Sequence, residues 1–184
     1  MNVTWQPSHP FIERPEQWPG AVLAVHQTLY RQVMAQDPLC NDKLPIELRA
    51  CRILEQWQVM LLVTPWMLSR LLLPLSPPEI TLPNGWSAEE REDADYRVLG
   101  PRLEFDLLGQ RQSAHLNYHR RLGHYLLQPL ILNMAEFDSV ENVFEAWNRV
   151  IRTRDDNMEK MRRDCPWQKE VSRRELFRGL RGNS

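Results

Sequence analysis

The stretch VMLLVTPWMLSRLLLPL, Val59–Leu75, is the most apolar part of this chain. A helix that spans a bilayer needs about 20 apolar residues, and this run is shorter and contains Pro65, Arg70 and Pro74. We therefore interpret it as buried structure and not as a membrane span. Because a proline biases the residue before it toward extended backbone, the run is typical of two strands around a Thr-Pro-Trp turn. Pro74 is expected at a strand end or a sheet edge.

Strand patterns continue on both sides of this run. The clearest has Leu103, Phe105 and Leu107 alternating with charged residues, which is the period of a half-buried strand. A further hairpin is expected around Gly123. The other predicted strands cover residues 46–54, 58–64 and 70–75, and the alternating one covers residues 102–108.

Two amphipathic helices are predicted, one on each side of the strands. In residues 20–36, Val22, Val25, Leu29 and Val33 recur on one helical face. The second covers residues 138–154, where Asp138 and Glu141 have the spacing of a capping box. A short C-terminal helix should follow a break at Cys165-Pro166.

Strands bracketed by helices, without regular alternation of the two, predict an α+β fold with a largely antiparallel sheet. The length of 184 residues fits one domain, 1–184. Residues 1–19 are expected to be irregular, and residues 164–184 to form a basic tail.

Charge and cysteine usage exclude several classes of protein. The net charge of −1 gives no global field that would attract nucleic acid. The N-terminus has no apolar core of the kind that a secretory signal needs. Cys40, Cys51 and Cys165 contain no CxxC pair, so neither a zinc ribbon nor a disulfide framework is expected.

Catalytic motifs are missing from the sequence. No glycine-rich phosphate loop, GxSxG or HExxH motif occurs. His115, His119 and His124 are the one metal-like group, and they define an alternative hypothesis, a small metal- or substrate-binding enzyme. Because HLNYH reads as a strand, His115 and His119 would stand about 13 Å apart, too far for one ion. We therefore expect no metal and no enzymatic activity.

Two features are candidates for binding a partner. Trp66, Met67 and Leu68 lie beside a run of leucines, where they pack a core or line a groove for an apolar peptide. The loop Ser87–Tyr96 carries five acids against one arginine. These acids form a solvated surface or pair with the arginines of a partner; the candidates are Glu89, Glu90, Glu92 and Asp93.

Four blocks in this order resemble the HybE family of [NiFe]-hydrogenase assembly chaperones. The first is LLVTPWMLSRLLLP, a hydrophobic strand, TPW and a second apolar strand that ends in proline. No block is a catalytic fingerprint, so the specificity lies in their joint order. The other three are RVLGPRLEFDLLG with Glu104-Phe105, YLLQPLILNMAEFDS with Met134, Glu136 and Phe137, and the C-terminal SRRELFRG.

The resemblance implies a non-catalytic cytoplasmic accessory protein without a cofactor. Its partner would be the hydrogenase small-subunit precursor, which is exported through a twin-arginine signal, together with other hydrogenase maturation proteins. Glu104 and Phe105 join the candidate partner-binding residues on this ground. An alternative within the same pathway is a scaffold for iron–sulfur cluster loading or subunit joining that does not contact the signal.

The C-terminal block has two interpretations. Ser172, Arg173, Arg174 and Phe177 match the order of residues in a twin-arginine export signal, although they lie at the wrong end of the chain. Ser172 and Glu175 also have capping-box spacing, which predicts the start of a helix. The block therefore caps a helix, or mimics a signal peptide, or does both.

Overall fold

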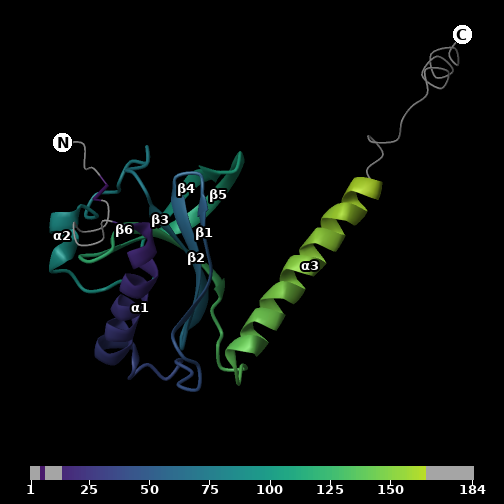
Figure 1. Ribbon diagram of the computed structural model, residues 1–184, viewed down its shortest axis with the longest axis horizontal. Coiled ribbons are helices and arrows are strands. Elements are labelled where there is room, and N and C mark those ends of the chain that lie inside the picture. The colour runs from purple at the N-terminus through teal and green to yellow at the C-terminus, as the bar shows by residue number, and fades with distance from the viewer. Residues whose placement is uncertain (1–4, 7–13, 165–184) are drawn as a thin grey trace, which may run out of the picture. The chain divides into compact units, whose positions relative to one another are not determined.

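The computed structural model describes residues 5–6 and 14–164 of the chain. The chain divides into two compact units, Met1–Val143 and Phe144–Ser184. The first unit contains the β-sheet (Figure 1). Its strands are β1 (Glu47–Leu54), β2 (Trp57–Thr64), β3 (Met67–Pro74), β4 (Arg102–Leu107), β5 (Gln110–His119) and β6 (Gly123–Ile131).

All six strands form one antiparallel sheet in the order β1-β2-β3-β6-β5-β4. The apolar run that dominates the sequence supplies β2 and β3, which pair from Thr64↔Met67 to Trp57↔Pro74 around a two-residue Pro-Trp turn. Their side chains are almost continuously buried, as expected for strands that are covered on both faces. Pro74 is the last residue of β3, so it removes no hydrogen bond from the strand interior.

Helix α1 (Trp18–Leu29) continues into a π-helical turn, η2 (Tyr30–Met34), and a short 3₁₀ turn, η1 (Pro15–Gln17), precedes it. Val22, Val25 and Leu29 pack onto one face of the sheet, against residues of β2, β3 and β6. The opposite face is covered by loop residues from outside the strands, including Trp5 and Leu82. The α+β prediction is confirmed: one antiparallel sheet, with an amphipathic helix on one face.

The second predicted helix is present but starts and ends differently. Helix α3 covers Val140–Asp164. The capping residue is Ser139, whose hydroxyl accepts a hydrogen bond from the backbone N–H of Asn142 at 3.2 Å. The predicted cap, Asp138, instead pairs with Lys43 at 2.8 Å. The helix runs past Arg154 because neither proline nor glycine follows until Pro166, and arginine, glutamate, lysine and methionine favour helix.

The sequence patterns missed the short helix α2 (Ala88–Glu92) inside the acidic loop and also η1 and the first two residues of α1, which lie in a segment expected to be irregular. Helix α2 carries no buried residue, so it leaves no apolar periodicity to detect. Within residues 5–6 and 14–164, no helix has the length and the apolar character that crossing a bilayer requires. The basic C-terminal tail lies outside the described residues, and so does the predicted short helix.

Candidate partner-binding groove

Two adjoining cavities follow one side of α1, and we call them together the α1 groove. The first has a volume of about 780 Å³ and the second about 560 Å³. The residues that line both are Glu92, Tyr118, Arg120 and Arg121, so the turn between β5 and β6 lies where the two cavities meet. The first cavity is further lined by Gln6, Gln17, Gly20, Ala21, Ala88 and Glu89. The second extends along α1 and η2 and reaches Val25, Leu29, Val33 and Tyr96.

The α1 wall of the groove is formed by small and uncharged residues. A proline in the first turn suits the start of α1, because its missing N–H has no partner there anyway. One helical face packs into the core, which turns Gly20 and Ala21 toward the first cavity. A Cβ atom added at Gly20 would meet no atom within 4 Å, so the wall is open at this point. A peptide backbone can therefore approach the helix closely.

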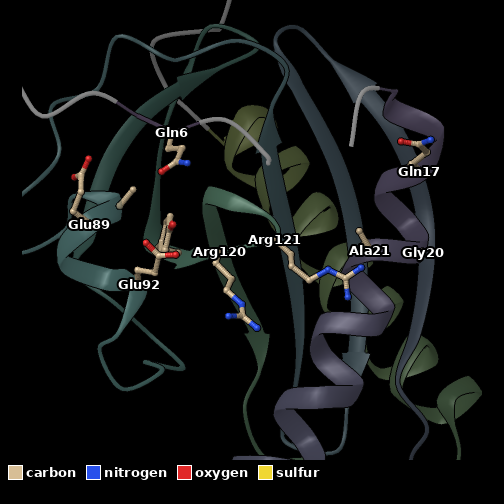
Figure 2. Close-up of a pocket in the computed structure, with 10 residues that line it drawn as sticks. Gln6, Gln17, Gly20, Ala21, Glu89, Glu92, Arg120 and Arg121 are labelled. Atoms are coloured by element: carbon tan, nitrogen blue, oxygen red, sulfur yellow. The ribbon is translucent and has the colours of Figure 1, made fainter. Parts of the chain in front are cut away.

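The opposite wall is α2, and its acids have two different roles. The Ser87 hydroxyl accepts from the Glu90 N–H at 3.2 Å, and the Glu90 carboxylate accepts from the Ser87 N–H at 3.0 Å. Hydrogen bonds from Ser87 lower the pKa of Glu90, which is therefore occupied as a cap. Glu89 and Glu92 are exposed and line the first cavity. Figure 2 shows both on the α2 side of the cavity, across from α1.

His124 attaches this acidic wall to the sheet. Its Nδ1 accepts from the Gln6 backbone N–H at 2.9 Å, so its Nε2 carries the hydrogen and donates to the Trp86 carbonyl at 2.8 Å. Burial is the main cause that lowers the pKa of His124, and the ring is therefore neutral at pH 7. Gly100 packs equally tightly, since a Cβ there would lie 2.0 Å from the Leu116 carbonyl oxygen. The segment before α2 is thus held by His124, and the segment after α2 is held by the close packing of Gly100.

The β5–β6 turn places two adjacent arginines in the groove. The Leu122 N–H donates to the His119 carbonyl at 2.8 Å, and the Leu122 side chain is buried in the core below. The Arg121 N–H donates to Nδ1 of His119 at 3.1 Å. Gly123 has a φ of 68°, a conformation that favours glycine. Arg120 and Arg121 are exposed, and their backbone is fixed by these contacts.

Charge is distributed unevenly across the groove. In Figure 2 Arg120 and Arg121 lie between the glutamates of α2 and the small residues of α1, with Arg121 extended toward α1. Within the described part of the chain, no ion pair involves Arg120 or Arg121. Among the described residues, the acidic side and the basic turn therefore line the same cavity without forming ion pairs with each other.

Of the partner-binding residues expected from the sequence, Glu89 and Glu92 line the groove. Trp66, Met67 and Leu68 are buried in the structure, with 7%, 2% and 0% of their surface exposed. The Trp66 ring stacks against Tyr30 at 6.4 Å between centroids, which places it in the core under α1.

The other expected residues lie elsewhere. Phe105 is buried edge-on against Trp57, at 5.7 Å between centroids, on the opposite face of the sheet from α1. Glu104 is exposed and pairs with Arg111 at 3.1 Å. Asp93 is exposed and lines neither cavity. The tail motif of Ser172, Arg173, Arg174 and Phe177 lies outside the described residues.

Sequence reasoning missed the arginines of the β5–β6 turn and the small face of α1. The available signal was HRRLG, in which two adjacent arginines are followed by Leu122 and then by the glycine of a predicted hairpin, where a turn exposes them together. Gly20 and Ala21 gave only a weak signal, because small residues on a helix carry no chemistry of their own.

The three histidines of the alternative enzyme hypothesis have separate partners. Nδ1 of His115 donates to the Gly100 carbonyl at 2.7 Å, whereas His119 and His124 each accept a different backbone N–H. Across the described ranges, no group of three or more His, Cys, Asp or Glu side chains is arranged to hold a metal ion.

Comparison with known proteins identifies the class. The family described as [NiFe]-hydrogenase assembly, chaperone, HybE matches residues 17–179. The chain belongs to this family, whose role in hydrogenase assembly is that of a non-catalytic chaperone. The structure is also similar to the solution structure of HybE from Escherichia coli, with a TM-score of 0.47, 16% identity, and coverage of 73% of this chain and 74% of that one. No curated protein sequence matches the chain significantly.

Proposed function

We propose that this chaperone acts in the cytoplasm on a [NiFe]-hydrogenase small-subunit precursor and that the α1 groove receives the basic part of the precursor's twin-arginine signal. The observation that carries the proposal is the pair Glu89 and Glu92, two exposed carboxylates on one side of a cavity of about 780 Å³. Carboxylates accept two parallel hydrogen bonds from an arginine, a geometry that lysine does not reproduce.

The dimensions of the groove suit an extended peptide. Its lining residues on the α1 side run from Gln17 to Val33, which is about 24 Å at 1.5 Å per helical residue. An extended chain covers that distance with about seven residues. The second cavity adds apolar surface, including Val33, which is 49% exposed. A peptide with a basic segment followed by an apolar one could therefore place its basic residues in the first cavity and its apolar residues in the second.

The proposal is tested by removing charge from the acidic side only. The double variant Glu89→Gln/Glu92→Gln is titrated with a fluorescently labelled peptide that contains Ser-Arg-Arg-x-Phe followed by a leucine-rich segment. At 0.15 M salt we expect its affinity to fall by about three- to tenfold, because two charge pairs that are partly exposed contribute modestly. The loss should shrink in 1 M salt, where screening acts over about 3 Å.

The matched control removes the same charge from the same loop. Glu90→Gln/Asp93→Asn leaves the groove lining intact, and glutamine at the third helical position still completes the capping box. Its peptide affinity should equal that of the wild type. Equal losses in the two double variants, or no loss in either, would refute the groove as the binding site. A precursor bound equally well with and without its signal would favour the scaffold role instead.

A further inference from the structure

The arginines of the β5–β6 turn are not explained by a groove that receives only basic residues. Arg120 and Arg121 line both cavities, and their charges would repel a partner that carries arginines alone. Two other arginines of the same unit, in contrast, have partners within the protein. Arg111 pairs with Glu104 and Asp106, and Arg91 lies 4.7 Å above the Trp86 ring.

We propose that Arg120 and Arg121 form a carboxylate-binding site, so that the segment in the α1 groove carries an acidic side chain next to its basic residues. The inference rests on the proposed function, which places the basic residues of the segment in the groove. It adds an acidic residue of the same segment. The segment's cations would face Glu89 and Glu92, and its carboxylate would face the two arginines across the same cavity.

Three features of the turn favour anion binding. The two guanidinium groups are adjacent in sequence, and each offers several N–H donors and no acceptor. The backbone beneath them is fixed by the His119–Leu122 hydrogen bond and by the burial of Leu122, so little ordering is needed on binding. His119, which lines the second cavity, accepts the Arg121 N–H at Nδ1 and so keeps a hydrogen on Nε2 as a further donor.

Protonation supports the same assignment. Burial, together with the neighbouring charges of Arg120 and Arg121, lowers the pKa of His119 from 6.5 to about 4. The ring is therefore neutral at pH 7, and the positive charge of this turn belongs to the arginines. The carboxylate of an occupant would reduce the electrostatic cost of holding those two charges side by side.

The test is a double-mutant cycle in which one change is made in the protein and one in the peptide. The affinity of each combination is measured by fluorescence anisotropy at 0.15 M salt. The probes are a labelled peptide that contains Ser-Arg-Arg-Glu-Phe followed by a leucine-rich segment, and its counterpart with glutamine in place of the glutamate. Wild type should bind the glutamate peptide about three- to tenfold more tightly than the glutamine peptide, because a charge-assisted hydrogen bond is lost with the carboxylate. In Arg120→Gln/Arg121→Gln this preference should disappear.

The control variant is Arg52→Gln/Arg97→Gln, which removes the same charge from exposed arginines outside the groove lining. It should keep the full preference for the glutamate peptide. The proposal is overturned if Arg120→Gln/Arg121→Gln weakens both peptides equally, or if it strengthens both, since the arginines would then only repel. It is also overturned if no probe binds the wild type.

The same titrations separate this inference from the proposed function. If Glu89→Gln/Glu92→Gln binds both peptides as the wild type does, the acidic side has no role in binding. If the preference for the glutamate peptide still depends on Arg120 and Arg121, the carboxylate site is supported and the proposed role of the acidic side is refuted. If instead the acidic side matters and the preference is absent from the wild type, the groove binds the basic segment and the carboxylate site is refuted.

Discussion

His26 makes the stability of this protein dependent on pH, and the structure gives the sign and the size of the effect. His26 belongs to the buried face of α1, with 2% of its surface exposed, and its Nδ1 is 2.8 Å from the Val22 carbonyl oxygen one turn earlier in the helix. It stacks on Trp66 at 6.5 Å between ring centroids. Burial lowers the pKa of His26 from 6.5 to about 4, because a charged imidazolium has no water around it there.

A folded-state pKa below the unfolded value means that the unfolded chain binds the proton more readily. The contribution of His26 to folding is therefore complete above pH 6.5 and is lost as the pH falls toward 4. One pKa unit corresponds to about 1.4 kcal/mol, so lowering the pH from 7.5 to 4.5 should cost about 2.5 kcal/mol of unfolding free energy through this residue.

His26→Phe is the informative variant, because phenylalanine keeps a ring against Trp66 and does not titrate. Guanidinium unfolding at pH 7.5 and 4.5, followed by tryptophan fluorescence, gives the free-energy difference for each protein. His119 and His124 also have lowered pKa values and remain in both proteins, so their effect cancels to first order in the comparison. The reasoning fails if the variant loses as much stability as the wild type between the two pH values.

Four further predictions concern stability and are measured by denaturant unfolding. Trp66→Ala should cost about 3–5 kcal/mol, as expected for a large core residue, and a loss below 1 kcal/mol would contradict its burial. Gly100→Ala should destabilise by about 1–3 kcal/mol, because its Cβ would clash with a backbone carbonyl. Gly20→Ala, in open space on α1, should stabilise by about 0.5–1 kcal/mol, and a matching loss at both glycines would refute the packing argument. Ser139→Ala should cost about 1 kcal/mol through the lost helix cap, and a larger loss on replacing Asp138 by alanine would show the cap to be misassigned.

Elements that bury apolar side chains could be predicted from the sequence. The β2–β3 hairpin follows from a long apolar run with a proline in the middle, and the helix that begins near Gly20 follows from its regular spacing of valine and leucine. Helix α2 could not be found in this way, because all its residues face solvent or the cavity and none repeats with a helical period. The sequence feature that could have predicted α2 is the capping-box spacing of Ser87 and Glu90.

The groove could be predicted only in part, for a different reason. Glu89 and Glu92 stood out as a local excess of charge, whereas Arg120 and Arg121 are far along the chain and acquire a role only because the sheet brings β5 and β6 beside α2. Apolar residues near a turn are equally consistent with core and with groove, so composition alone could not decide the place of Trp66. Burial decides it.

The two hydrogen bonds between Gln6 and His124 join residues separated by 118 positions. During synthesis, a ribosome that adds about 5–20 residues per second needs roughly 6–24 seconds to travel between them. The acidic wall of the groove is attached through the same histidine, so on a nascent chain the groove has no fixed second wall until β6 has emerged. If the α1 groove binds the client as proposed, a growing chain should not be able to hold it, and client binding should begin only when most of the first unit has been translated.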